Sequence, residues 1–274
     1  MEIPKGLISF STAAIICITV PTILVSSFYI FPNKRKLPRD SVEVIKKRIQ
    51  SSIISSIIST AIVRYTFNDY SLKVVGTWMG FTFTNFLPSV LISTVLTTVL
   101  FIGPIWVDYK QNSLWNNCTC TWINFRNIII GPVIEELLFR SCMVPVLVAG
   151  GLSQTAIIFG SPLLFGIAHL HHMIENIKNG GTFQNALAIA VLQLTYTSLF
   201  GFFATFLFFQ TGNVISCIVS HMICNYIGLP DLSFWENDPH LRGMGATLYI
   251  TGLIVFSILT TWYCTYTSLY PLFI

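Results

Sequence analysis

The sequence has very little charge. Only 9% of its 274 residues are Asp, Glu, Lys or Arg, whereas about a quarter of the residues are charged in an ordinary soluble domain. Four long runs contain none of these residues: 74–107, 141–174, 179–230 and 243–274. Each run is long enough for one or two membrane-spanning helices. Together with a content of 53% apolar residues, these runs predict a polytopic membrane protein.

Common metal and redox motifs are also missing. The chain has no HExxH sequence, which zinc metalloproteases usually carry on a helix, and no CxxC pair. Its five histidines are too few and wrongly spaced for the histidine boxes of membrane desaturases. We therefore expect no metal and no cofactor, and we expect the seven cysteines to be mostly buried free thiols within the spans.

Basic residues are concentrated in one short stretch. Seven of the fifteen Lys and Arg residues lie within residues 34–48, directly after the first apolar segment. A nucleic-acid-binding protein would carry a basic face on a soluble module, so we expect no nucleic-acid partner. The positive-inside rule instead predicts that this stretch is cytosolic and that the N-terminus is luminal.

About eight segments have the length and composition of helical spans. They are residues 7–31, 44–65, 87–107, 127–148, 154–170, 185–209, 214–228 and 244–266. The predicted fold is all-α, a polytopic transmembrane helix bundle in which residues 1–274 form a single membrane domain. Serines at 51, 52, 55, 56 and 59 follow a helical period, which is typical of close helix packing in lipid.

The fourth segment carries three charges in an otherwise apolar run. Between residues 128 and 148 only Glu135, Glu136 and Arg140 are charged, and each would cost about 2.5 to 3.5 kcal/mol at the centre of a membrane helix. Glu136 and Arg140 share a helix face at i,i+4 spacing, so we expect a structural ion pair. Glu135 is left outside this pair and is a candidate general base for a water molecule.

Three further polar residues fall at a similar predicted depth. His169 ends the fifth segment, while His221 and Asn225 lie four residues apart on one face of the seventh. An imidazole beside an activated water can share its proton and pass it to a leaving amine, a role suited to His169. His221 and Asn225 can donate hydrogen bonds to a developing oxyanion. This combination indicates hydrolysis of an amide bond.

These polar residues belong to three short motifs. The motifs read Glu135-Glu136-x-x-x-Arg140, Phe165-x-x-x-His169 and His221-x-x-x-Asn225. Taken together and in this order, they resemble the motifs of the type II CAAX prenyl endopeptidases, also called Ras-converting enzymes or CAAX prenyl protease 2, within the ABI/CPBP superfamily. The resemblance covers residues 131–229, inside a motif-bearing core of about residues 127–229, and is closest to the eukaryotic branch.

The resemblance implies an eight-helix intramembrane protease of the endoplasmic reticulum, with an active site open to the cytosolic side. Such an enzyme removes the last three residues of farnesylated or geranylgeranylated CAAX proteins, among them Ras- and Rho-like GTPases. It also implies that Glu135 and His169 activate water and that His221 and Asn225 stabilise the oxyanion. Glu136 and Arg140 would then be structural support.

Two other classes of function stay open. A zinc-dependent membrane metalloprotease is conceivable, with Glu135, His169 and His221 as ligands. A non-catalytic membrane scaffold or transporter would use the intramembrane Glu and Arg for proton coupling. Against a transporter, the sequence has no visible internal repeat, and its polar residues gather toward one side of the membrane.

The predicted topology can be tested at a glycosylation motif. The sequon Asn117-Cys118-Thr119 lies in the loop 108–126, which the positive-inside rule places in the cytosol. We expect this asparagine to stay unmodified, because it does not reach the lumen. Treatment of the expressed protein with an endoglycosidase should leave its electrophoretic mobility unchanged. A shift would contradict the topology.

Overall fold

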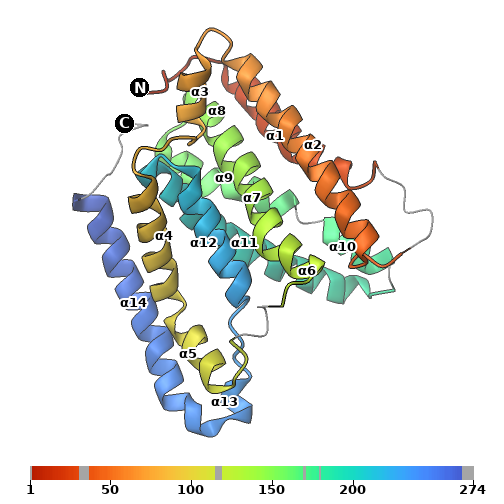
Figure 1. Ribbon diagram of the computed structural model, residues 1–274, viewed down its shortest axis with the longest axis vertical. Coiled ribbons are helices and arrows are strands. Elements are labelled where there is room, and N and C mark those ends of the chain that lie inside the picture. Colours follow the sequence, from red (N-terminus) through yellow and green to blue (C-terminus); the bar gives the residue numbers. More distant parts are fainter. Residues whose placement is uncertain (1, 31–36, 115–118, 169–170, 179, 267–274) are drawn as a thin grey trace.

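The computed structural model describes residues 2–30, 37–114, 119–168, 171–178 and 180–266, with only the backbone described at 168, 171, 172 and 264–266. Within these ranges every regular element is a helix (Figure 1). The helices outside the central segment are α1 (Phe10–Ser27), α2 (Val42–Thr66), α3 (Leu72–Trp78), α4 (Phe86–Leu100), α5 (Ile102–Lys110), α9 (Gln154–Ala168), α10 (His171–Lys178), α11 (Phe183–Thr211), α12 (Val214–Ile227), α13 (Phe234–Asn237), η4 (Pro239–Leu241) and α14 (Arg242–Tyr266).

The central segment is one nearly continuous helical path with changes of winding. It runs through α6 (Trp122–Asn124), η2 (Phe125–Ile130), α7 (Gly131–Glu136), η3 (Leu137–Cys142) and α8 (Met143–Ala149). η2 and η3 are π-helical. Pro132 and Pro145 each follow a π segment, and a proline cannot bond to the carbonyl four residues before it. Those carbonyls, at residues 128 and 141, lie inside η2 and η3. The prolines therefore favour the wider turns on either side of α7.

The helices form a central group, with a pair of helices on one side and three helices on the other. In Figure 1, α7, α8, α9, α11 and α12 occupy the middle, α1 and α2 lie together on one side, and α4, α5 and α14 lie on the other. Contacts of α12 with both α4 and α7 tie the trio to the centre, and contacts of α1 with α8 tie the pair to it. The predicted all-helical fold is confirmed.

Several helices are suited to a membrane. Phe10–Ser27, Phe183–Thr211 and Pro239–Tyr263 are each long and apolar enough to cross one, and α4 with α5 makes a fourth candidate if the bent pair counts as one span. A helix lies at each of the eight predicted segments. The described residues thus contain three or four candidate spans by length and composition, fewer than the eight that the sequence predicts.

The predicted third span is broken. α4 and α5 meet at an angle of 64° after Leu100, because the ring of Pro104 would clash with the Leu100 carbonyl in a continuous helix. α14 packs closely along both pieces. A Cβ on Gly103 would lie 2.5 Å from the Tyr249 ring, and one on Gly252 would lie 2.8 Å from the carbonyl oxygen of Val99. Only glycine permits this approach at both positions.

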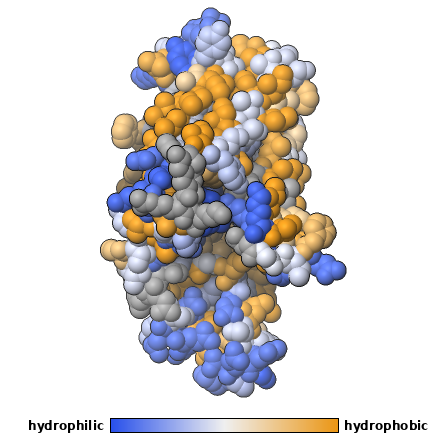
Figure 2. Space-filling model, turned by 90° about the vertical axis from the view of Figure 1, so that its right-hand side faces the viewer, coloured by the Kyte–Doolittle hydropathy of each residue, from blue (hydrophilic) through white to orange (hydrophobic). Residues whose placement is uncertain are grey.

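α2 turns its polar side inward. Its five periodic serines are buried and their exposed counterparts are isoleucines, at 53, 54, 57 and 58. The Ser55 and Ser56 hydroxyls donate to the carbonyls of Ser51 and Ser52, so their polarity is satisfied within the helix. Small side chains inside, most of them hydrogen-bonded to the helix's own carbonyls, and large apolar ones outside suit a helix in lipid. Figure 2 shows apolar residues over much of one face, with hydrophilic residues at its two ends and in a group at mid-height.

The five cysteines whose side chains are described are free thiols. Cys17, Cys142 and Cys217 are buried, Cys224 is half-buried and Cys120 is exposed. The expectation of buried free thiols in the spans is confirmed for Cys17, Cys142 and Cys217. Cys118 lies outside the described residues.

Several short helices lie outside the predicted segments, among them α3 before the third and α10 between the fifth and the sixth. α10 was not predicted because a contact with a distant part of the chain helps to hold it. Its Glu175 forms an ion pair with Arg48 of α2 at 2.8 Å, a contact between residues far apart in the chain.

Candidate active site

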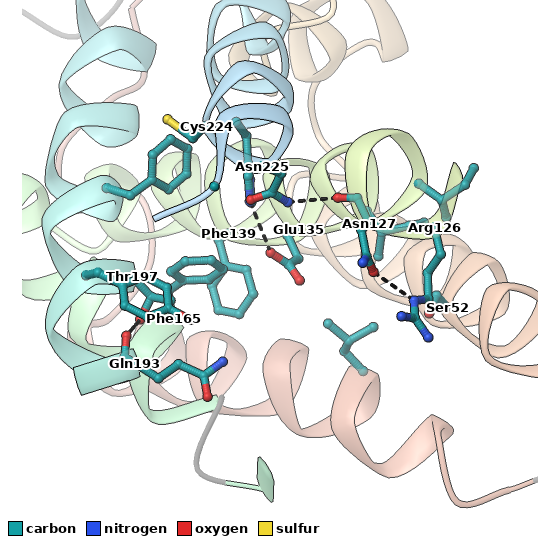
Figure 3. A pocket seen from close by; sticks show the side chains of 18 of the residues that line it. Ser52, Arg126, Asn127, Glu135, Phe139, Phe165, Gln193, Thr197, Cys224 and Asn225 are labelled. Atoms are coloured by element: carbon teal, nitrogen blue, oxygen red, sulfur yellow. Dashed lines mark hydrogen bonds and ion pairs between the residues drawn. The ribbon is translucent and has the colours of Figure 1, made fainter. Parts of the chain in front are cut away.

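A cavity of about 560 Å³ lies among α1, α2, η2, α7, α9, α11 and α12. Glu135, His221 and Asn225 all line it, so three of the four predicted catalytic residues meet in one place. Figure 3 shows Glu135 and Asn225 facing this space from different helices. The remaining wall is largely apolar and aromatic, including Phe139 and Phe165, whose rings lie 4.7 Å apart.

The two adjacent glutamates have different environments. The Glu135 side chain is 27% exposed and lines the cavity, whereas the Glu136 side chain is fully buried. Successive residues of a helix point about 100° apart, which is sufficient to separate their surroundings. The structure therefore confirms the predicted geometry, in which the two adjacent glutamates lie in different surroundings.

Arg140 holds Glu136, as the i,i+4 spacing predicts. Its Nη1 donates to Glu136 Oε1 at 3.0 Å and lies 3.0 Å from Oε2. Its Nη2 donates to the Gly201 carbonyl of α11 at 3.3 Å. The guanidinium also lies over the Phe165 and Phe200 rings, at 5.0 and 5.7 Å from their centroids. A buried guanidinium thus has a carboxylate, a carbonyl and two aromatic faces as partners.

Gly201 makes this arrangement possible. A Cβ at this position would lie 2.5 Å from Pro162 Cβ of α9 and 3.3 Å from Arg140 Nη2. The missing side chain lets α11 approach α9 and presents the Gly201 carbonyl to the arginine. α11 and α9 pack extensively as a result.

His221 contacts both glutamates. Its Nδ1 lies 2.7 Å from Glu136 Oε1, and its Nε2 lies 3.7 Å from Glu135 Oε2. Glu136, predicted as a structural partner of Arg140, is therefore also a partner of His221. Because the Glu136 carboxylate already accepts a bond from Arg140, we treat it as the acceptor and assign the Nδ1 proton to the bond with it, which leaves Nε2 directed toward Glu135.

Asn225 lies one helical turn beyond His221. Its Nδ2 donates to the backbone carbonyl of Asn127 at 2.8 Å, so it ties α12 to η2 (Figure 3). α12 is also held from its other side, where the hydroxyls of Ser220 and Thr97 share a hydrogen bond of 2.7 Å. These contacts fix the helix that carries both third-motif residues.

His169 lies outside the described residues. α9 is described up to Ala168, and Phe165 of the second motif lines the cavity. The Phe165 ring meets the His221 ring edge-on at 6.4 Å. The second motif thus reaches the site through Phe165.

The cavity also contains polar residues that sequence reasoning missed. Arg126 and Asn127 come from η2, and Gln193 and Tyr196 come from α11. None belongs to a recognisable motif, and Gln193 and Tyr196 look like occasional polar residues of a membrane helix. Only the packing of α11 against the site shows that Gln193 and Tyr196 line the cavity.

No group of three or more His, Cys, Asp or Glu side chains suited to a metal ion occurs within the described part of the chain. His169, one of the three ligands considered for zinc, is not included in that search.

Comparison with known proteins gives the family. A family model described as type II CAAX prenyl endopeptidase Rce1-like matches residues 117–227. The human CAAX prenyl protease 2 is 33% identical over 261 residues, which cover 89% of this chain and 78% of the human protein. The chain belongs to the CAAX prenyl protease 2 family.

Other eukaryotic members of the CAAX prenyl protease 2 family match over similar lengths. The probable CAAX prenyl protease 2 of Schizosaccharomyces pombe is 36% identical over 248 residues, covering 85% of this chain and 87% of that protein. The Arabidopsis thaliana protein is 29% identical over 284 residues, covering 92% and 89%. No solved structure matches the chain. The family resemblance of the three motifs is confirmed, and every predicted site residue lies within the matched residues 117–227.

The buried ion pair generates a stability prediction. Arg140→Met leaves the Glu136 carboxylate buried without its cation, so we expect the free energy of unfolding to fall by about 3 to 5 kcal/mol. The double variant with Glu136→Gln should lose less, because the uncompensated charge is gone. Thermal unfolding in detergent would measure both.

Lys47→Met is the matched control, since Lys47 and Glu43 form an i,i+4 pair of the same spacing at 2.8 Å on the exposed surface. Its loss should change the free energy of unfolding by less than about 1 kcal/mol. Equal losses for Arg140→Met and Lys47→Met would contradict the role assigned to the buried pair.

Proposed function

We propose that this membrane enzyme is an endopeptidase that removes the C-terminal tripeptide from farnesylated or geranylgeranylated CAAX proteins, such as Ras- and Rho-like GTPases. The observation that carries the proposal is the meeting of Glu135, His221 and Asn225 at one cavity inside a membrane-type helical bundle. Membership of a family whose relatives are named CAAX prenyl proteases supplies the substrate class. A peptide-bond hydrolase needs a base, a water molecule and oxyanion donors, and the cavity can hold all three.

Glu135 is proposed as the general base. Its carboxylate is the acidic group on the cavity wall, and its partial exposure allows a water molecule to approach. It takes a proton from the water, and the resulting hydroxide attacks the carbonyl carbon of the prenylcysteine. The proton then passes to the leaving amine. His169 is proposed to share this proton, from a position four residues after the cavity residue Phe165 in the sequence.

His221 and Asn225 are proposed as oxyanion donors. With Nδ1–H donated to Glu136, His221 can donate from Nε2 only as the doubly protonated imidazolium, whose second proton would point into the cavity beside Glu135. Asn225 has two N–H groups on its amide, and the bond to Asn127 uses one of them. The other can reach toward the substrate. Glu136 then acts through His221, because it holds the imidazole in one orientation, as carboxylates commonly do for catalytic histidines.

The finer topology belongs to the same proposal. We propose one domain of residues 1–274 with eight spans in the endoplasmic reticulum membrane, a luminal N-terminus and a cavity that opens toward the cytosol. Arg39 and Arg48 of the basic stretch line the cavity, and basic residues favour the cytosolic side of a membrane. The lipid bilayer gives prenylated substrates lateral access.

The catalytic assignments are tested by substitution. Glu135→Ala, His169→Ala and His221→Ala should each lower tripeptide release from a prenylated CAAX peptide by at least about a hundredfold, because each removes a group that acts on the reacting atoms. Release can be followed by mass spectrometry with purified enzyme in vesicles. Glu43→Gln, an exposed glutamate of α2, is the control and should keep full activity.

Membrane content and melting temperature should be similar for the wild type and Glu135→Ala, since Glu135 is partly exposed. Full activity of Glu135→Ala would refute the mechanism. Equal cleavage of the prenylated peptide and its unprenylated twin would point to a general intramembrane peptidase.

The alternative of zinc catalysis makes a different prediction. If Glu135 acts as a base without metal, the purified protein should hold no stoichiometric zinc, and chelators should not reduce its activity. Metal analysis alongside an assay after chelator treatment measures both. Bound zinc that rises and falls with activity would favour the metalloprotease, while a protein inactive on every CAAX peptide would favour the scaffold or transporter.

A further inference from the structure

One end of the active-site cavity is cationic. Arg39, Arg48 and Arg126 line it, from the α1–α2 connection, α2 and η2 respectively. Arg39 and Arg48 both pair with Glu175, at 3.6 and 2.8 Å, and Arg126 pairs with Asp40 at 2.9 Å. Three guanidinium groups and two carboxylates leave this group of five with one net positive charge.

Arg126 has an unused donor at this end. Its Nε donates to Asn127 Oδ1 at 2.9 Å and its Nη2 contacts Asp40, whose side chain is 57% exposed. Its Nη1 is buried and has no hydrogen-bond partner. A buried donor on a charged group without a partner is costly, and an anionic ligand in the cavity would satisfy it.

The position of Arg126 fits one particular anion. Arg126 and Glu135 lie nine residues apart on the same helical path, which corresponds to at most about 13 Å along the axis, since the π-helical η2 rises less per residue than an α-helix. An extended tripeptide reaches about 10 Å, and the length of the arginine side chain can account for the difference. Figure 3 shows both residues beside the cavity, with Asn127 between Arg126 and Asn225.

We propose that Arg126, supported by Arg48, binds the C-terminal carboxylate of the substrate and thereby sets the cut three residues from the chain end. This inference rests on the proposed function, because it assumes that a CAAX peptide occupies the cavity. It adds a specificity determinant that the three motifs do not contain. The enzyme would measure the distance from a free carboxylate to the bond beside Glu135.

The test compares two prenylated CAAX peptides that differ only at the terminus, one with a free carboxylate and one with a carboxamide. We expect wild-type kcat/KM to be at least about tenfold higher for the acid, since hydrogen bonds to charged groups contribute about ten- to hundredfold. Arg126→Gln should lower kcat/KM for the acid to near that of the amide and leave the amide itself almost unchanged.

Asp40→Asn is the matched control. It breaks the same ion pair with Arg126 but keeps the guanidinium, so the preference for the acid should persist. Lys47→Gln removes a cation one residue before Arg48 on an exposed face and should also leave the preference intact.

Equal kcat/KM for acid and amide in the wild type would overturn the inference while leaving the proposed function standing. A loss in Arg126→Gln that is the same for both peptides would also overturn it, because Arg126 would then be structural. So would a defect that depends on anionic lipid in the vesicles rather than on the peptide terminus, because the ligand would then be a lipid headgroup.

A binding measurement covers the case in which neither peptide is cleaved, an outcome that would refute the proposed function itself. Fluorescent versions of the two peptides are titrated against wild-type protein in detergent. Tighter binding of the acid, lost in Arg126→Gln but kept in Asp40→Asn, supports the carboxylate site independently of catalysis. Equal binding of both peptides overturns it.

Discussion

The buried contact among Arg140, Glu136 and His221 holds the site together. Ionisable groups in the interior of a membrane bundle are tolerated only when they satisfy one another. Here the carboxylate of Glu136 forms hydrogen bonds with Arg140 at 3.0 Å and with His221 at 2.7 Å, and Arg140 donates a further hydrogen bond to the Gly201 carbonyl. Three separate parts of the chain are thereby fixed at one point. They are the central segment (α7 and η3), α11 and α12.

The catalytic geometry follows from that fixed point. Glu135 precedes the buried glutamate by one residue, so the helix turns it away from Arg140 and onto the cavity wall. Held at Nδ1 by Glu136, the His221 ring presents Nε2 to the same wall. A structural pair and the proposed general base therefore occupy neighbouring positions, and the stability of the first determines the placement of the second.

The surroundings of the site could be anticipated in part. Apolar periodicity located a helix at every predicted span, and the serine spacing of α2 located its buried face, since both depend on local sequence. The 64° break between α4 and α5 and the docking of α10 were not anticipated. Pro104 favours the break locally, but the packing of α14 against it, with Tyr249 close to Gly103, depends on distant residues, as does the contact of Glu175 in α10 with Arg48.

The sequence by itself determined the all-helical membrane class, the three motifs and the pairing of Glu136 with Arg140, because composition and i,i+4 spacing are local properties. Only the tertiary structure decided that Glu136 also holds His221, 85 residues away in the chain, and that Arg126 shares the cavity with Glu135. No periodicity links such residues. Their meeting depends on how α11 and α12 pack against the central segment, through glycine contacts and buried hydrogen bonds.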